Sequence, residues 1–262
     1  MVLTSFSFFG DAGDGVVDKP IAGPNLSSTA ISSIFGWFVE EMKKIFPGKS
    51  SREIVEKYSH PLMCVIGCES TGKSATIENM TKVPMFPSAS GICTRCPIRV
   101  VMIPSDPEES TGAQKQRTPL KKDKSQAPAA KYTLSHRNRV IQVFDDSNCN
   151  SIKDRVAEIF NEIKTSCPLG YDDKEITITV ERPNVIRMDF VDLPGIVSYP
   201  EDARNFTLNL SIGYIQKPDS FILCVANATT PRLTSYEPIA RIIHANACDR
   251  TIVVLPMADK LP

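Results

Sequence analysis

Apolar residues form short continuous runs in parts of this chain and recur at helical spacing in others. Short apolar runs are typical of buried strands, whereas spacings of three and four are typical of helices that pack on them. The runs predict strands at 62–66, 98–103, 140–144, 176–180, 185–191, 221–226 and 251–255. The spacings predict helices at 75–82, 152–163, 204–216 and 236–246. Strands that alternate with helices indicate an α/β fold with a mostly parallel sheet flanked by helices.

Two stretches show neither the apolar runs of strands nor the helical spacing of apolar residues. Residues 1–28 are rich in Gly, Ser, Asp and Pro, and we expect them to be a disordered N-terminal segment. Residues 104–138 are expected to be a disordered insertion, with six basic residues and one acid between Lys115 and Lys131. A solvated loop is the favoured interpretation of this basic insertion, and contact with an anionic lipid or a protein partner is the alternative.

An amphipathic helix and a connector are expected in residues 29–59. Eight apolar side chains recur at helical spacing between Ile31 and Phe46, and Pro47-Gly48 ends the pattern. The polar face carries two glutamates and two lysines, whereas helices that lie on membranes usually have a more basic face. This balance favours packing against other helices over a membrane surface.

The strand at 62–66 leads into the loop Gly67-Cys68-Glu69-Ser70-Thr71-Gly72-Lys73-Ser74. The pattern Gly-x-x-x-x-Gly-Lys-Ser/Thr between a strand and a helix is the phosphate-binding loop of nucleoside triphosphatases. A helix N-terminus offers unpaired N–H groups and partial positive charge to a phosphate, and glycines allow close approach. We expect all eight residues to bind nucleotide, with Lys73 on the terminal phosphates and the Ser74 hydroxyl on Mg²⁺.

A second loop, Asp192-Leu193-Pro194-Gly195, follows the strand at 185–191. Asp-x-x-Gly is a weak signal alone, but it gains weight after a strand and downstream of a phosphate loop. In phosphoryl-transfer sites such an Asp holds Mg²⁺ through water, and the Gly N–H can bond the γ-phosphate. The turn that ends at Asp259 follows another strand, and ligand loops are expected at the carboxyl ends of parallel strands.

Composition excludes several classes of protein. The 262 residues are 42% hydrophobic, which is enough for a sizeable core, and the formal net charge is zero. A neutral chain argues against nucleic-acid binding driven by overall charge. Eight cysteines in a chain of this length do not indicate a small disulfide framework, and no segment has the pattern of a signal peptide or the length of a membrane span. We expect a cytoplasmic protein.

The motifs, taken in order, resemble those of the dynamin superfamily of large GTPases. The resemblance spans Leu62 to Leu261 and rests on the phosphate loop, Glu78-Asn79, Gly91-Ile92-x-Thr94-Arg95-x-Pro97, Asp192–Gly195 and Arg250-Thr251-Ile252. It implies a dynamin-type GTPase domain at 60–262 that hydrolyses GTP to GDP and phosphate with Mg²⁺. It also implies nucleotide-gated dimerisation through this domain, with membrane remodelling and membrane or microtubule association through regions found in larger members.

The resemblance also implies roles for individual residues. Thr94 would ligate Mg²⁺ and hold the attacking water, so that Ser74, Thr94 and Asp192 would form the metal site. Ser70 would help to bind a charge-compensating monovalent cation. Asp259 would read guanine. The helix at Ile31–Phe46 would correspond to a helix of the family's signalling bundle.

The sequence departs from the family pattern at four places. Glu69 replaces a Gln beside the γ-phosphate, Ala89 replaces a Gly, Pro256 and Met257 replace Thr and Lys, and the chain stops at Pro262 before the last strand and helix of the GTPase core. The catalytic candidates are Glu69, Ser70, Lys73 and Thr94. Since Glu69 and Met257 could weaken turnover, a nucleotide-binding scaffold with little or no hydrolysis stays open as the alternative function.

Overall fold

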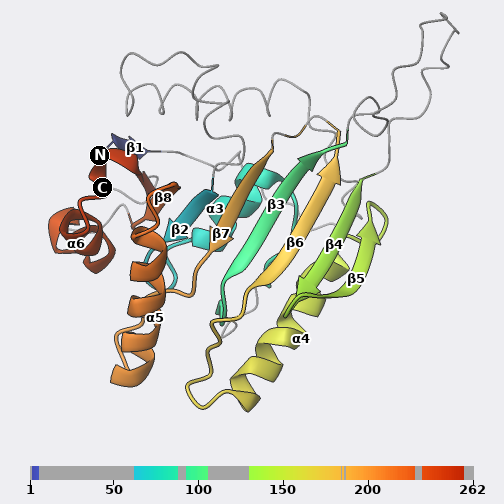
Figure 1. Ribbon diagram of the computed structural model, residues 1–262, viewed down its shortest axis with the longest axis horizontal. Coiled ribbons are helices and arrows are strands. Elements are labelled where there is room, and N and C mark those ends of the chain that lie inside the picture. Colours follow the sequence, from blue (N-terminus) through green and yellow to red (C-terminus); the bar gives the residue numbers. More distant parts are fainter. Residues whose placement is uncertain are drawn as a thin grey trace, which may run out of the picture.

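The computed structural model describes residues 2–5, 62–87, 93–105, 130–183, 185, 187–227 and 232–256. Nine strands in this part form one sheet in the order β1–β9–β8–β2–β7–β3–β6–β4–β5 (Figure 1). The strands are β1 (Val2–Ser5), β2 (Leu62–Ile66), β3 (Ile98–Pro104), β4 (Lys131–His136), β5 (Arg139–Asp145), β6 (Ile176–Arg182), β7 (Met188–Asp192), β8 (Ser220–Val225) and β9 (Thr251–Leu255). The described helices are α3 (Lys73–Thr81), α4 (Ser151–Ser166), α5 (Glu201–Ile215) and α6 (Glu237–His244), with short 3₁₀ turns η1 (Leu233–Ser235) and η2 (Cys248–Arg250).

The sheet is mostly parallel, which confirms the predicted fold class. β1, β9, β8, β2 and β7 run parallel to one another, as do β3 and β6. The pairings of β3 with β7, and of β4 with both β5 and β6, are antiparallel. Val65 near the end of β2 pairs with Asp192 at the end of β7. The loops that follow these two strands therefore leave the sheet side by side.

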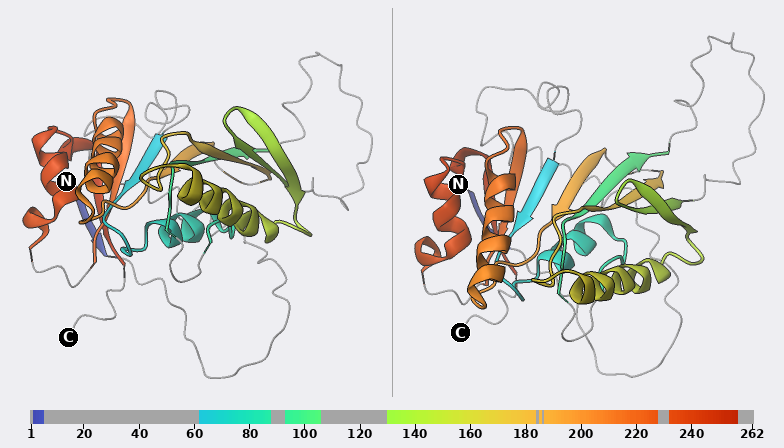
Figure 2. Two further views of the ribbon diagram at one scale, coloured as in Figure 1. Left: turned by 90° about the horizontal axis from the view of Figure 1, so that it is seen from below. Right: turned by 60° about the horizontal axis from the view of Figure 1, so that its bottom comes forward.

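Two hydrophobic clusters fill the space between the sheet and its helices. The first lies under α3 and α4 and includes Ile77 and Phe160. The second lies under α5 and α6 and includes Ile215 and Ile239. Figure 2 shows α3 and α4 together on one side of the sheet. β8 is buried at all six positions because successive residues enter opposite clusters, whereas β3 alternates between buried and half-buried positions. The unbroken apolar run of β8 reflects this two-sided burial.

Most predicted elements are present with shifted boundaries. α3 begins at Lys73 and so includes the last two residues of the phosphate loop. α5 begins at Glu201, three residues before the predicted start. The strand predicted from Val185 begins at Met188 as β7.

Two predictions of disorder are wrong in part. Val2–Ser5, within the segment 1–28, forms β1 and pairs with β9. Lys131–His136, within the insertion 104–138, forms β4 and turns into β5 through Arg137 and Asn138, both at positive φ as a tight primed hairpin turn requires. Tyr132 and Leu134 are buried on one face of β4, which explains why this basic-looking segment is ordered. The rest of the insertion, 106–129, and the helix predicted at Ile31–Phe46 lie outside the described residues.

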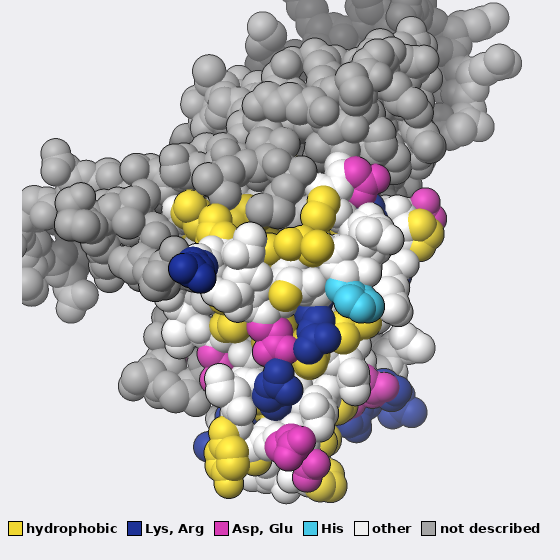
Figure 3. Space-filling view, turned by 90° about the vertical axis from the view of Figure 1, so that its left-hand side faces the viewer, with side chains coloured by type: hydrophobic (Ala, Val, Ile, Leu, Met, Phe, Trp, Pro, Cys, Tyr) yellow, Lys and Arg dark blue, Asp and Glu magenta, His cyan; other side chains and the backbone are white. Residues whose placement is uncertain are grey.

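The surface on the α5 and α6 side carries interspersed acidic and basic side chains in its described part (Figure 3). This mixture agrees with the zero net charge of the chain. Among the helices that the structure describes, none combines the length and the hydropathy that crossing a bilayer requires.

Candidate functional site

The predicted phosphate loop connects the end of β2 to the start of α3 in a conformation that needs both of its glycines. A Cβ on Gly67 would lie 2.5 Å from the Val225 carbonyl oxygen and 2.8 Å from Thr71 Oγ1. Gly72 has a φ of 88°, in the left-handed region that glycine adopts without strain. Ser70, at a φ of 57°, is one of the few non-glycine residues in that region. The loop therefore turns tightly before its backbone enters the helix.

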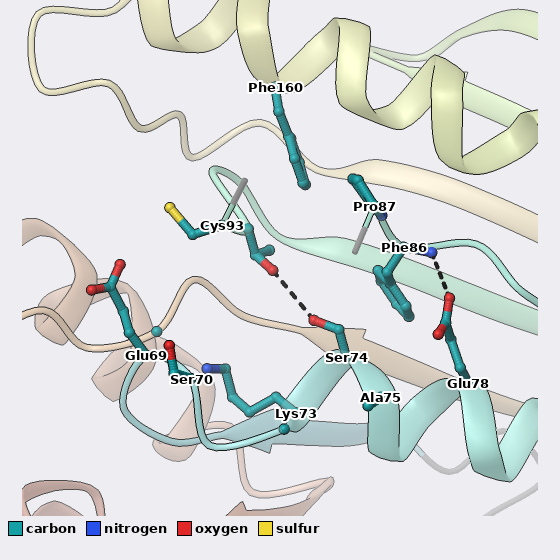
Figure 4. Close-up of a pocket in the computed structure, with 13 residues that line it drawn as sticks. Glu69, Ser70, Lys73, Ser74, Ala75, Glu78, Phe86, Pro87, Cys93 and Phe160 are labelled. Atoms are coloured by element: carbon teal, nitrogen blue, oxygen red, sulfur yellow. Dashed lines mark hydrogen bonds between the residues drawn. The ribbon is translucent and has the colours of Figure 1, made fainter. Parts of the chain in front are cut away.

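Lys73 folds back over this loop instead of pointing into solvent (Figure 4). Its Nζ donates a hydrogen bond to the Cys68 carbonyl oxygen at 2.8 Å, and Thr71 Oγ1 donates to the same oxygen at 3.0 Å. Burial lowers the pKa of Lys73, and the nearby Asp192 carboxylate partly offsets this effect. A buried cation with this one hydrogen bond to a neutral carbonyl is well placed to exchange it for a phosphate oxygen.

Three oxygens from three separate elements meet beside Lys73. Ser74 Oγ at the start of α3 donates to Asp192 Oδ2 at 2.7 Å, and Thr94 Oγ1 donates to the same oxygen at 3.0 Å. The two hydroxyl oxygens lie 3.5 Å apart. These are the three residues that the sequence predicts as Mg²⁺ ligands, and the structure brings them together.

The surroundings of Asp192 fit a divalent cation. The side chain is fully buried, and its Oδ1 has no hydrogen-bond partner within the described part of the chain. Burial raises the pKa of Asp192, while Lys73 and the two hydroxyl donors act in the opposite direction. A buried carboxylate with one unpaired oxygen costs free energy unless a cation or donor satisfies it. Hydroxyl and carboxylate oxygens are the ligands that Mg²⁺ prefers.

The second predicted loop lies directly against the first. The Ile196 N–H donates to the Gly67 carbonyl oxygen at 3.2 Å, and Cys68 and Ile196 form an isolated parallel bridge. A Cβ on Gly195 would lie 2.7 Å from the Glu69 nitrogen and 2.8 Å from its Cα. Gly195 therefore allows a backbone-to-backbone contact between the two loops.

A cavity of about 590 Å³ opens above the two loops, large enough for a nucleotide's phosphates and more. Figure 4 shows Phe160 of α4 reaching toward it from the far side, opposite Lys73 and Ser74. The predicted residues that line it are Glu69, Ser70, Gly72, Lys73, Ser74, Thr94 and Gly195. Residues that were not predicted as site residues are Ala75, Glu78, Phe86, Pro87, Cys93 and Phe160.

Glu78 was quoted only as part of a motif, and its structural role is specific. Its Oε1 accepts hydrogen bonds from the backbone N–H groups of Met85 and Phe86, both at 2.8 Å. These contacts hold the chain that leaves α3 against the same helix. A carboxylate one turn after a phosphate loop, followed by a helix end, is the sequence signal that could have suggested this role.

The segment that carries Thr94 is held in place by a turn far away in sequence. The Arg95 guanidinium carbon lies 5.4 Å from the centroid of the Tyr171 ring, and its Nη1 donates to the Gly170 carbonyl oxygen at 3.2 Å. The Arg95 carbonyl oxygen accepts from the Asp172 N–H at 3.0 Å. Tyr171 also stacks on Phe206 of α5, with 6.2 Å between ring centroids. No local pattern indicated this arrangement.

The remaining predicted positions lie outside the described residues. Asp259, Met257 and Ala89 are in that group. Cys68 and Thr71 do not line the cavity, but both form part of the loop that supports it.

Sequence comparisons give relatives for most of the chain. A sequence model described as the dynamin family matches residues 63–258. The chain is 27% identical over 205 residues to a dynamin-1-like protein of Danio rerio, with 76% of this chain and 28% of that protein aligned. It is 26% identical over 200 residues to dynamin-related protein 3B of Arabidopsis thaliana, with 73% and 23% aligned. It is 25% identical over 211 residues to the putative dynamin-related protein 4A of the same plant, with 77% and 60% aligned. The chain thus spans about a quarter of the first two relatives.

Proposed function

Because the chain belongs to the dynamin family, we propose that it binds GTP and hydrolyses it to GDP and phosphate with Mg²⁺. The observation that carries the proposal is the convergence of Lys73, Ser74, Thr94 and Asp192 at the carboxyl ends of two parallel strands, beside a cavity. A cation and three hard oxygen ligands in that arrangement match a triphosphate with its metal.

Each of these side chains has a distinct task. Lys73 exchanges the Cys68 carbonyl for the terminal phosphates and stabilises negative charge that develops on them. Ser74, Thr94 and Asp192 hold the metal, and Mg²⁺, when bound, supplies positive charge to the phosphate oxygens. Gly195 lines the cavity next to Glu69, and its N–H is proposed to bond the γ-phosphate. Thr94, held by Arg95 and Tyr171, positions the attacking water.

The family also suggests how the activity is used. We infer that nucleotide gates self-association through this domain, and that the activity serves membrane remodelling at a peripheral membrane location. Asp259 is proposed to read guanine, and Ser70 to help hold a monovalent cation. Contact with membranes or microtubules would use regions beyond this chain.

A nucleotide-binding scaffold is the second candidate, and Glu69 favours it. The residue is exposed at the cavity, beside Gly195, and would bring a carboxylate to the place where the reaction concentrates negative charge. Two like charges about 4 Å apart repel by roughly 4 kcal/mol at an effective dielectric near 20. Uncompensated repulsion of that size slows a reaction by about a thousandfold.

Titration with labelled GTP, GDP and ATP, with and without Mg²⁺, tests the proposal, and phosphate release separates the two candidates. We expect tight binding of GTP with Mg²⁺ and weaker binding of ATP, since adenine lacks the donors that Asp259 would accept. Lys73→Ala should weaken GTP binding at least tenfold through loss of a charge-assisted contact.

Lys164→Ala is the matched control, since Lys164 is an exposed lysine of α4 that does not line the cavity. It should bind GTP as the natural chain does. Failure of the natural chain to bind GTP, or equal binding by Lys73→Ala, would exclude the proposed nucleotide site. Binding without phosphate release would establish the scaffold.

A further inference from the structure

Tyr236 reaches the phosphate loop from the opposite end of the domain sequence. Its hydroxyl accepts a hydrogen bond from the Cys68 N–H at 2.7 Å and donates one to the Val225 carbonyl oxygen at 3.0 Å. The first of these contacts joins residues 168 positions apart. The hydroxyl thus links the phosphate loop to the end of β8.

Cys68 is the residue through which this contact can act on the cavity. While its N–H bonds Tyr236, its carbonyl oxygen accepts from both Lys73 Nζ and Thr71 Oγ1. The orientation of the peptide groups at Cys68 therefore sets where Lys73 lies. Neither Cys68 nor Tyr236 lines the cavity, so this contact lies behind the loop and not on the side that nucleotide would occupy.

The loop has room for this hydroxyl because Gly67 lacks a side chain. A Cβ at that position would lie 3.2 Å from the Tyr236 hydroxyl oxygen, as well as 2.5 Å from the Val225 carbonyl. The glycine, the hydroxyl and the end of β8 therefore meet at one point. The hydroxyl therefore has a partner both as a donor and as an acceptor.

Packing and neighbouring ion pairs hold Tyr236 in place. It immediately precedes α6, and its ring packs against the hydrophobic cluster under α5 and α6. The next residue, Glu237, accepts two hydrogen bonds from Arg204 of α5, at 2.7 and 2.9 Å, and one from Arg241 of α6 at 3.0 Å. Burial raises the pKa of Tyr236, so the phenol stays neutral and keeps its proton for Val225.

We propose that Tyr236 is a positioning residue for nucleotide binding, which holds the phosphate loop in its binding-competent conformation through Cys68. The inference rests on the proposed function and goes beyond it, because Tyr236 belongs to none of the phosphate or metal motifs. Without the hydroxyl, a backbone donor and a backbone acceptor lose their shared partner, and the loop relaxes. The apparent affinity for nucleotide is then the intrinsic affinity multiplied by the fraction of molecules in which the loop remains competent.

Tyr236→Phe removes the hydroxyl and keeps the ring. We expect the Kd for GDP and for a non-hydrolysable GTP analogue to rise together by about tenfold, which is about 1.4 kcal/mol. The KM for GTP should rise similarly, while kcat at saturating GTP stays within about twofold, since loop ordering is shared by the ground and transition states. A role confined to stability would move neither dissociation constant.

Tyr132→Phe is the matched control. It also removes a tyrosine hydroxyl with a side-chain partner, Asp146 at 2.9 Å, but lies on β4 away from the phosphate loop. It should leave both dissociation constants unchanged. An equal loss of affinity in the two variants, or unchanged affinity in Tyr236→Phe, would overturn the inference.

Hydrogen exchange in the natural chain gives a test that does not require the Tyr236→Phe variant to fold. The Cys68 amide should exchange its hydrogen slowly in the nucleotide-free protein, because Tyr236 accepts from it; fast exchange of this amide in a folded chain would overturn the inference. The proposed function is tested separately from the positioning role. Absence of GTP binding by the natural chain would refute the proposed function. Normal GTP binding by the natural chain, together with unchanged affinity in Tyr236→Phe, would refute only the positioning role.

Discussion

The contact between Gly195 and Glu69 allows a sharp test of how the two loops meet. Gly195→Ala adds one methyl group where the backbones of the two loops approach each other. The new Cβ would lie 2.7 Å from the Glu69 nitrogen, 2.8 Å from its Cα and 2.9 Å from its Cγ. Two of these atoms belong to the backbone, so a side-chain rotation cannot relieve the clash.

The cost follows from the size of the overlap. Carbon atoms in contact prefer separations of about 3.5–4.0 Å, so the loops must move apart by roughly 0.7 Å or more. Overpacking of this kind costs about 1–3 kcal/mol. At about 2–4 °C per kcal/mol for a chain of this size, the melting temperature should fall by roughly 2–12 °C.

Under the proposed function, the same separation displaces the Gly195 N–H from the γ-phosphate. A shift near 1 Å in a positioning group can reduce turnover about a hundredfold. GDP lacks the γ-phosphate, so its affinity should change little. The expected signature is a large loss of GTP turnover, a modest loss of stability and nearly normal GDP binding. Thermal unfolding, phosphate release and GDP titration measure the three quantities.

Gly213→Ala is the matched control, since no atom lies within 4 Å of a Cβ at this position in α5. The same substitution there should stabilise the protein by about 0.4–1 kcal/mol, because alanine restricts the unfolded chain. If Gly195→Ala had the same melting temperature and the same GTP turnover as the natural chain, the inferred close contact between the two loops would be refuted. If both variants lost stability equally, the effect would not be local.

Two further predictions concern charge at the site. Glu69→Gln should raise turnover, by up to about a thousandfold if repulsion is uncompensated, with the fold unchanged by circular dichroism; a fall would instead show that the carboxylate takes part in the reaction. Asp192→Asn should raise the melting temperature of the nucleotide-free protein, since burial raises the pKa of Asp192 and its charged form is disfavoured in the fold. The same variant should lose most of the Mg²⁺ dependence of GTP binding in a titration, and unchanged dependence would contradict the metal assignment.

The parts of the fold that sequence analysis anticipated are those with local causes. The strand at 62–66, the loop after it and the helix that begins at Lys73 depend on neighbouring residues, so the pattern and the glycines were sufficient. The continuous apolar runs likewise indicated β8 and β9, because both of their faces are covered.

The parts that it missed depend on contacts between distant residues. β4 was hidden because a composition rich in Lys and Ser masked its alternating Tyr132 and Leu134, which are buried only after pairing with β6. Tyr171 and Tyr236 reach the site from positions with no motif around them, and their roles exist only in three dimensions. The antiparallel pairing of β3 with β7 depends on chain topology, which apolar patterns do not encode.

The pairing of β1 with β9 determines which residues a domain must include if it is not to aggregate. The predicted domain 60–262 omits Val2–Ser5, although the backbone of these residues completes the edge of the sheet beside β9. A chain shortened to begin at residue 60 would leave the apolar strand Thr251–Leu255 with an open row of N–H and C=O groups. Such an edge is a template for pairing with other molecules, so aggregation of the shortened protein would reflect a missing strand and not a defective nucleotide site.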